Sequence, residues 1–286
     1  MPNHVQTNVV VTGEDKEVKR FVELVMSKKK SPYGEDMVDY FDFDKVIPMP
    51  ESLNITSGST TSNAIALIQA EQGDFAEIDK ISDYPWIQEK KPASSTLSLR
   101  EFTIKEVKKN IDEKAMKEGQ MALDNTEKYG CATWYDWKCQ YWGTKWGAYD
   151  CHVNEEADGL FTMAYNTAWS PATPIFDKLS EMFPALHFNM SFIDEGMGFA
   201  GRQEWINGDF IENMYEGNDM YEFANDEFGG EYVKCECGEW FNSDWYEEGQ
   251  DENKCEDCQL TEEDEKEQTL IDEKNGLYPD KEDISN

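Results

Sequence analysis

Hydrophobic and polar residues alternate along several short stretches, a pattern typical of strands with one buried face. Residues 4–13 alternate and are rich in β-branched side chains, which predicts a first strand. A helix is predicted over residues 14–27, with Lys28 to Lys30 at its C-terminal end, where the helix dipole favours positive charge. Residues 40–47 alternate again before Pro48 and predict a second strand.

After residue 128 the pattern predicts a helix and then a hairpin. The helix covers residues 134–141, and the two strands cover residues 148–153 and 160–165. Asp158-Gly159, between the strands, favours a tight turn.

A last helix and two strands complete this region. Ser170 is expected to cap the helix, with Pro171 at its first position. The strands are predicted at residues 186–193 and 198–205. This order of elements predicts an α+β protein, a ferredoxin-like antiparallel sheet with helices on one face.

Residues 55–128 interrupt this order with a polar, helical pattern in which Pro85 and Pro92 act as breakers. We therefore predict four parts. They are a ferredoxin-like α+β core (1–54 and 129–206), a mostly helical insertion (55–128), a small acidic region with four cysteines (207–260) and an acidic tail (261–286).

The chain is strongly acidic, with 60 Asp and Glu against 26 Lys and Arg and a net charge of −34. Such a chain on average repels DNA and anionic membranes, which argues against direct binding to nucleic acid or membrane. The charge is uneven, because the residues after Gln203 hold 28 acidic and 5 basic side chains, and the rest hold 32 and 21. Aromatic residues make up 13% of the chain and can support folded cores.

No apolar run approaches the roughly 20 residues that span a bilayer. The first residues also lack the basic start and apolar stretch of a secretory signal. We therefore expect a cytoplasmic protein in which the seven cysteines are thiols or metal ligands and not disulfides.

Residues 133–146 contain four tryptophans. Trp134, Trp137 and Tyr141 lie three and four apart and would share one helix face, a spacing more typical of buried core than of a ligand site. Lys145 beside Trp146 leaves open a site that faces a ligand.

Four cysteines near the C-terminus form a C-x-C pair, Cys235 and Cys237, and a C-x-x-C pair, Cys255 and Cys258. Two tight turns would bring four soft thiolates together as a zinc site, and a segment this small needs such a site to fold. With four thiolate ligands the site is closed, so Zn²⁺ would be structural in a zinc-ribbon-like region. Unligated reduced thiols or another soft metal are the alternatives.

Other candidate nucleophiles have simpler explanations. Cys131, Cys139 and Cys151 are expected to be buried free cysteines, because Cys151 and His152 are adjacent in a strand and point to opposite faces. His187, in a strand, is expected to be structural. Phosphate-binding glycine loops and hydrolase or metalloprotease motifs are absent from the sequence, so no catalytic residue is predicted.

Several blocks of sequence resemble the YubB-type family of bacteriophages and plasmids. They are MPNHVQTNVVVTG at the start, FDFDKVIPMPESL (41–53), YDWKCQYWGTKWGAYD (135–150), TAWSPATPIFDKLSEMFPALHF and DEGMGFAG (194–201). The resemblance covers residues 1–54 and 129–206 and leaves out the insertion and the acidic C-terminal region. It implies a ferredoxin-like domain, a mobile-element origin and a bacterial host, and it brings no catalytic residues.

These features favour a non-enzymatic acidic binding protein encoded by a phage or plasmid. Dense carboxylates on a rigid support can imitate the phosphates of DNA and bind the basic cleft of a host nuclease, restriction enzyme or CRISPR-type complex. The protein would then be an anti-defence inhibitor. The candidate partner-binding residues are Asp244, Glu247, Glu248, Asp251, Glu252, Glu256 and Asp257, with the aromatic residues Trp240 and Trp245. Plain solubility is the simpler explanation of the same charges.

Two alternatives belong to other classes. An accessory protein would bind single-stranded nucleic acid by stacking bases on aromatic residues of the sheet face. A metal-dependent hydrolase would use a pair of the abundant carboxylates, and its activity would depend on a divalent metal.

Overall fold

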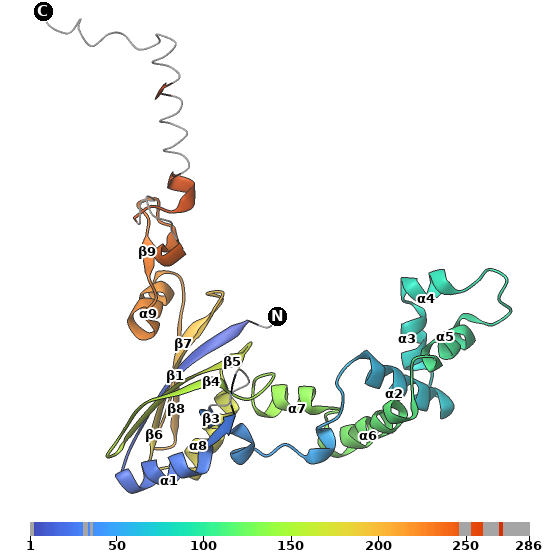
Figure 1. The fold of residues 1–286 in the computed structure, drawn as a ribbon, viewed down its shortest axis with the longest axis horizontal. Helices are drawn as coiled ribbons and strands as arrows, with labels where there is room; N and C mark the ends of the chain where they lie inside the picture. Colours follow the sequence, from blue (N-terminus) through green and yellow to red (C-terminus); the bar gives the residue numbers. More distant parts are fainter. Residues whose placement is uncertain (1–2, 31–33, 35–36, 246–252, 260–268, 271–286) are drawn as a thin grey trace, which may run out of the picture. The chain divides into compact units, whose positions relative to one another are not determined.

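The computed structural model describes residues 3–30, 34, 37–245, 253–259 and 269–270 (Figure 1). The chain divides into two compact units, which we describe separately. The core unit consists of Met1–Gly196 and Arg202–Glu212, and the C-terminal unit consists of Met197–Gly201 and Asn213–Asn286.

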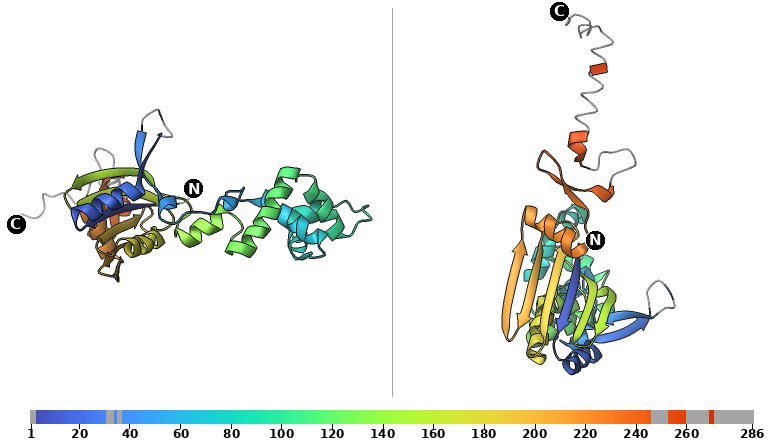
Figure 2. Two further views of the ribbon diagram at one scale, coloured as in Figure 1. Left: turned by 90° about the horizontal axis from the view of Figure 1, so that it is seen from below. Right: turned by 90° about the vertical axis from the view of Figure 1, so that its left-hand side faces the viewer.

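A six-stranded sheet forms the centre of the fold, and its strand order is β4-β5-β1-β6-β7-β8 (Figure 2). β1 pairs antiparallel with both β5 and β6, and β4 pairs antiparallel with β5. The prediction of an α+β fold with an antiparallel, ferredoxin-like sheet is confirmed. The strands are β1 (His4–Thr12), β4 (Tyr149–Ala157), β5 (Leu160–Ala168), β6 (His187–Asp194), β7 (Ala200–Ile206) and β8 (Asp209–Tyr215).

Helices α1 (Asp15–Val25) and α8 (Thr173–Met182) cover one face of this sheet (Figure 1). Phe21 of α1 lies edge-on to Phe188 of β6 with ring centroids 5.6 Å apart, and Phe176 of α8 lies 6.0 Å from the same ring. The alternation of apolar residues in the strands therefore places their large side chains under these two helices.

The other face of the three central strands is mainly polar. Its side chains include Gln6, Asn8, Thr162, Asn166 and Asn189. The aromatic side chains of the same strands are at most 1% exposed and lie on the covered face; they are Phe161, Tyr165, Phe188 and Phe192. These three strands therefore do not present the expected aromatic face that stacks bases, because the period of two places all four rings in the core.

The segment after α1 also differs from the prediction. α1 ends at Val25, and Met26 is already extended, so the three lysines lie in β2 (Met26–Lys30) and not at a helix end. β2 pairs antiparallel with β3 (Met37–Phe41) in a separate two-stranded sheet. Lys29 Nζ lies 3.7 Å from the ring centroid of Tyr40, which gives this lysine a structural contact.

The predicted second strand, residues 40–47, contains only the end of β3. The Asp42 side chain accepts a hydrogen bond from the Asp44 backbone N–H and begins a 3-10 helix, Phe43–Lys45. Phe41 and Phe43 are both buried in the core, where their ring centroids lie 5.0 Å apart. A second short 3-10 helix, Glu51–Leu53, follows.

In sequence, helices follow β3 and precede α7 (Trp134–Tyr141) and β4, as predicted for residues 55–128, and they lie beside the sheet and not within it (Figure 2). They are α2 (Ser59–Glu71), α3 (Ala76–Ser82), α4 (Pro85–Lys90), α5 (Leu99–Lys108) and α6 (Glu113–Tyr129). A small core of Ala66, Leu67, Ile78 and Val107 holds them together. α2 and α6 approach closely at Gly119, where a Cβ would lie 2.7 Å from Cβ of Ala64.

α7 (Trp134–Tyr141) and the β4–β5 hairpin with its Asp158-Gly159 turn agree with the predictions. Ser170, however, is not the helix cap. α8 begins at Thr173 after Ala172, and the Ser170 hydroxyl donates a short hydrogen bond to the carbonyl oxygen of Gly143. This bond ties the loop after α7 to the loop after β5.

The C-terminal unit contains a helix that the sequence analysis missed, α9 (Asn218–Phe228). It is followed by a hairpin of β9 (Tyr232–Lys234) and β10 (Trp240–Asn242) and a 3-10 helix, Ser243–Trp245. The sequence analysis also did not predict β8, the last strand of the six-stranded sheet. Among the described residues, no helix is both long enough and apolar enough to cross a membrane.

A four-cysteine cluster as candidate metal centre

The first cysteine pair lies in the turn between β9 and β10. The N–H of Cys235 donates to the Glu239 carbonyl over 2.8 Å, and the N–H of Gly238 donates to the Cys235 carbonyl over 2.9 Å. Gly238 has a φ of +102°, which a residue with a side chain adopts only with strain. The tight turn directs both Cys235 and Cys237 to the same side.

The second pair lies at a helical turn, residues 256–259. Cys255 precedes the turn and its carbonyl accepts a hydrogen bond from the Gln259 N–H over 3.1 Å, while Cys258 lies within it. The C-x-x-C spacing therefore brings two sulfurs together within one turn of helix, as the hairpin turn does for the C-x-C pair.

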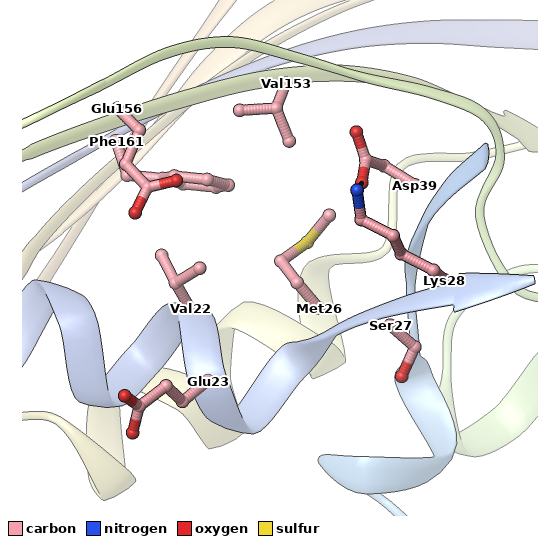
Figure 3. A pocket seen from close by; sticks show the side chains of 9 residues that line it. All are labelled: Val22, Glu23, Met26, Ser27, Lys28, Asp39, Val153, Glu156 and Phe161. Carbon is pink, nitrogen blue, oxygen red and sulfur yellow. Dashed lines mark ion pairs between the residues drawn. The ribbon is translucent and has the colours of Figure 1, made fainter. Parts of the chain in front are cut away.

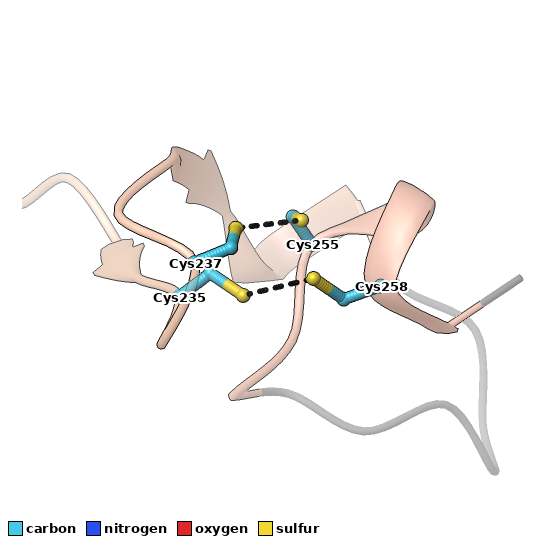
Figure 4. A group of neighbouring side chains, drawn as sticks. All are labelled: Cys235, Cys237, Cys255 and Cys258. Atoms are coloured by element: carbon cyan, nitrogen blue, oxygen red, sulfur yellow. Dashed lines mark hydrogen bonds between the residues drawn. The ribbon is translucent and has the colours of Figure 1, made fainter. Parts of the chain in front are cut away.

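The two pairs face each other (Figure 4). The Sγ atoms of Cys235 and Cys258 are 3.6 Å apart, and those of Cys237 and Cys255 are also 3.6 Å apart. All four sulfurs lie within 4.8 Å of one another. A tetrahedral ion with metal–sulfur bonds of about 2.3 Å separates its ligands by about 3.8 Å, so the donor set fits one soft metal ion. The predicted ligands are thus brought together.

The electrostatics of the cluster also suit metal binding. Backbone hydrogen bonds from Cys255 and Cys237 lower the pKa of Cys235 to about 6. Hydrogen bonds with the sulfurs of Cys237 and Cys255 raise the pKa of Cys258, because a proton there is shared with its neighbours. Without a metal, Cys235 is therefore a thiolate at neutral pH, while Cys258 keeps a proton that a metal cation would replace.

α9 supports the cysteine hairpin. The Trp240 ring stacks on Tyr221 with centroids 5.0 Å apart and planes 7° apart, and its Nε1 donates to Asn218 over 2.8 Å. Asn225 accepts from the Tyr232 backbone N–H and donates to the Tyr232 carbonyl. Trp240, predicted to contact a partner, is therefore half-buried and links the hairpin to the helix.

The structure describes only some of the acidic residues that were predicted to bind a partner. Asp244, Glu256 and Asp257 are exposed, while Glu247, Glu248, Asp251 and Glu252 lie outside the described residues. Trp245 ends the 3-10 helix, Ser243–Trp245.

Acidic residues of α9 were overlooked by the sequence analysis. Asp219, Glu222 and Asp226 are exposed at a spacing of three and four, so they share one face of the helix. The sequence did contain a helical pattern here, since the apolar pair Phe223 and Ala224, which the helix buries, lies between these charged residues. It was missed because the charges along this stretch concealed the two buried residues between them.

The tryptophan-rich block is largely structural. Trp137 and Trp142 are buried, and Trp142 Nε1 donates to the Ile47 carbonyl over 2.9 Å. Lys145 differs, since its Nζ lies 4.7 Å from the Trp146 ring centroid and 4.8 Å from that of Trp169. Trp169 is 41% exposed and has a φ of +77°, which is strained for a bulky residue.

The remaining thiols and histidines agree with the sequence analysis. Cys131 and Cys151 are buried and Cys139 is half-buried. Burial raises the pKa of all three thiols, which keeps them protonated at neutral pH. His152 is exposed, and His187 Nε2 lies 3.1 Å from Glu204 Oε2.

The core unit also contains an open cavity of about 470 Å³ beside α1 (Figure 3). Half-buried apolar side chains of α1, β2 and β4 form its floor with Phe161, and Lys28 and Asp39 form an ion pair of 3.8 Å across one end. Glu23 and Glu156 line it as well.

A comparison with protein-family models agrees with the ferredoxin-like fold of part of the chain. Residues 148–233 match a family model described as the ferredoxin-like domain in Api92-like protein. This part of the chain resembles an Api92-like ferredoxin-like domain. The match includes β4 to β7, which the sequence analysis assigned to the core, and it extends through β8 and α9.

One solved structure is also similar, a crystal structure of a protein api92 from Yersinia pseudotuberculosis. It is 10% identical in sequence with a TM-score of 0.36, over 76% of this chain and 99% of that one. No curated protein matches the sequence.

Proposed function

We propose that this protein is a non-enzymatic binding protein whose C-terminal unit folds around a structural zinc ion and presents carboxylates to a basic partner. The observation that carries the proposal is the convergence of four cysteine sulfurs within 4.8 Å. Zinc is the metal that such a closed set of four thiolates favours. The ion would supply folding energy and no chemistry at an open coordination position.

The surface around the cluster is acidic. Ten exposed Asp and Glu side chains lie between residue 213 and residue 259 among the described positions, from Glu216 to Asp257. The only lysines there are Lys234 and Lys254, and no arginine is present. Fixed carboxylates of this density attract basic surfaces and accelerate their association.

The partner that fits this surface is a protein with a basic DNA-binding cleft. Carboxylates held on α9 and on the cysteine hairpin would occupy positions that DNA phosphates otherwise take. If the chain comes from a phage or plasmid, as its resemblance to the YubB-type family implies, the target would be a host nuclease, restriction enzyme or CRISPR-type complex. The protein would then act as an anti-defence inhibitor inside a bacterial host.

Affinity capture from host lysate tests this proposal. The wild-type protein is expected to recover a DNA-handling protein or complex, and added duplex DNA is expected to compete with it. A variant with Glu222→Gln, Glu236→Gln and Glu239→Gln removes three exposed charges without changing side-chain shape, and it is expected to lose most of the capture.

The matched control carries Asp83→Asn, Glu89→Gln and Glu127→Gln, three exposed acidic residues of the helical region. It should capture as well as the wild type. Equal capture by both variants, or capture that duplex DNA does not reduce, would refute the DNA-mimic proposal.

A second candidate function, binding of single-stranded nucleic acid, rests on the exposed Trp169 and on Lys145. Lys145 has no carboxylate ion-pair partner among the described residues, although the chain is strongly acidic. A base could stack on Trp169 while Lys145 neutralises a phosphate. A gel shift at low salt separates the candidates, because this one requires a complex that Trp169→Ala abolishes and the DNA mimic requires none.

A further inference from the structure

The cavity beside α1 combines an apolar floor with acidic walls (Figure 3). Val22 and Met26 are one helical turn apart and half-buried, as is Val153 across from them on β4. They border the core residues Val18, Phe21 and Val25, which are fully covered. The strip of three side chains is therefore apolar surface that the fold leaves partly open.

A carboxylate stands beside this strip. Glu156 projects from β4 toward Val22, whereas the Glu23 side chain points to the other side of α1 (Figure 3). Both are exposed, and neither has an ion-pair partner among the described residues. Of the nearby cations, Lys28 pairs with Asp39 at 3.8 Å, and Lys19 pairs with Asp15 at 2.8 Å and lies 3.9 Å from Asp158.

We propose that this cavity binds an arginine side chain of a partner protein. The methylene groups of arginine would cover Val22, Met26 and Val153, and the guanidinium would reach the Glu156 carboxylate. Long cationic side chains commonly bury their stems on apolar surface and keep the charge at its edge. A planar guanidinium also matches a carboxylate with two parallel hydrogen bonds, which an ammonium cannot do.

Charge complementarity selects this occupant. An acidic or neutral apolar side chain would leave Glu156 without a partner, and the net charge of −34 repels anions at a distance. This site lies on the core unit and does not involve the cysteine cluster. A failure of this proposal would therefore say nothing about the proposed zinc centre, and the reverse also holds.

NMR titration of the full chain with labelled methionine and valine methyl groups tests the proposal. The probe is N-acetyl-arginine amide, and N-acetyl-citrulline amide is the neutral probe of nearly the same shape. Arginine is expected to shift the Met26, Val22 and Val153 signals in a saturable manner, with a dissociation constant on the order of millimolar, since the site is exposed.

The variant Glu156→Gln is expected to bind the arginine probe about tenfold more weakly. Glu127→Gln, an exposed change on α6, should leave binding unchanged. Equal shifts with the citrulline probe, unaltered affinity in Glu156→Gln, or shifts confined to methyl groups away from α1 and β4 would each overturn the proposal.

Discussion

At the scale of single residues, the protonation of the cysteines would decide how the proposed metal site of the C-terminal unit takes up an ion. Backbone N–H groups of Cys255 and Cys237 stabilise the Cys235 thiolate and lower its pKa to about 6. Hydrogen bonds with the sulfurs of Cys237 and Cys255 raise the pKa of Cys258. The hairpin turn therefore holds one charged sulfur that a metal ion would use as a ligand.

The pH dependence of metal binding follows from this. Because the folded pKa of Cys235 is below its ordinary value of 9.0, the thiolate is present above about pH 6 and is lost as the pH falls through that value. Zinc affinity is expected to fall steeply between about pH 7 and pH 5. Competition with a chromophoric chelator measures the zinc affinity at each pH. An affinity that is constant down to pH 5 would contradict the assignment of the four cysteines as zinc ligands.

Buried thiols are expected to behave differently. Desolvation raises the pKa of Cys151, and the side chain is 7% exposed, so little reactive thiolate is available. Iodoacetamide at pH 8 should therefore leave Cys151 unmodified in the native protein and modify it after denaturation. Mass spectrometry of the peptides reads this out, and rapid native labelling of Cys151 would show that the β3–β4 region opens.

At the scale of elements, close contacts in turns determine how the strands pair. Gly159 lies in the β4–β5 turn with a φ of +75°, and a Cβ there would lie 2.6 Å from the Gly13 carbonyl oxygen. Gly208, between β7 and β8, has a similar φ of +85° but no atom within 4 Å of its Cβ position.

Alanine at these two glycines separates backbone strain from steric contact. Both variants incur about 1 kcal/mol for the left-handed conformation. Gly159→Ala is expected to lose a further ~1–3 kcal/mol from the clash with Gly13. Urea unfolding monitored by circular dichroism measures the difference, and equal losses in the two variants would show that the turn moves to accept the methyl group.

Sequence patterns predicted the elements in which alternation or helical spacing is regular. β1, α7, the β4–β5 hairpin and the strands β6 and β7 were predicted for this reason. The second strand was not, because a single side-chain hydrogen bond at Asp42 changes an alternating stretch into a 3-10 turn. α9 was missed because its acidic face concealed the two buried residues between the charges.

The cysteine ligands could be predicted from spacing alone, since two short motifs fix the geometry of each pair. The packing of the cysteine hairpin on α9 could not be predicted from the sequence. It depends on the contact of Trp240 with Tyr221, residues that belong to different elements and carry no shared motif. The open cavity beside α1 likewise depends on which apolar residues the sheet leaves uncovered, and this is set by packing rather than by sequence period.

At the scale of the whole molecule, the two units are expected to differ in what holds them together. The core unit has large aromatic clusters under α1 and α8, whereas the C-terminal unit buries few apolar side chains among its described residues. Its stability should therefore depend on the metal.

Hydrogen exchange with and without a chelator tests this difference. Chelation is expected to raise exchange in residues 232–259 and to leave β1 and β5 protected. Unchanged exchange in the C-terminal unit would mean that hydrogen bonds and Trp240 stacking suffice without metal. Exchange that rises equally in both units would mean that they unfold together.

Native mass spectrometry of the purified full chain tests the central claim most directly. The account predicts one zinc ion per chain, and none in the double variant Cys237→Ser, Cys258→Ser. The control Cys139→Ser, which changes a half-buried thiol outside the cluster, should retain the ion. A metal-free wild-type chain that is folded in its C-terminal unit, or zinc retained by the double variant, would contradict it.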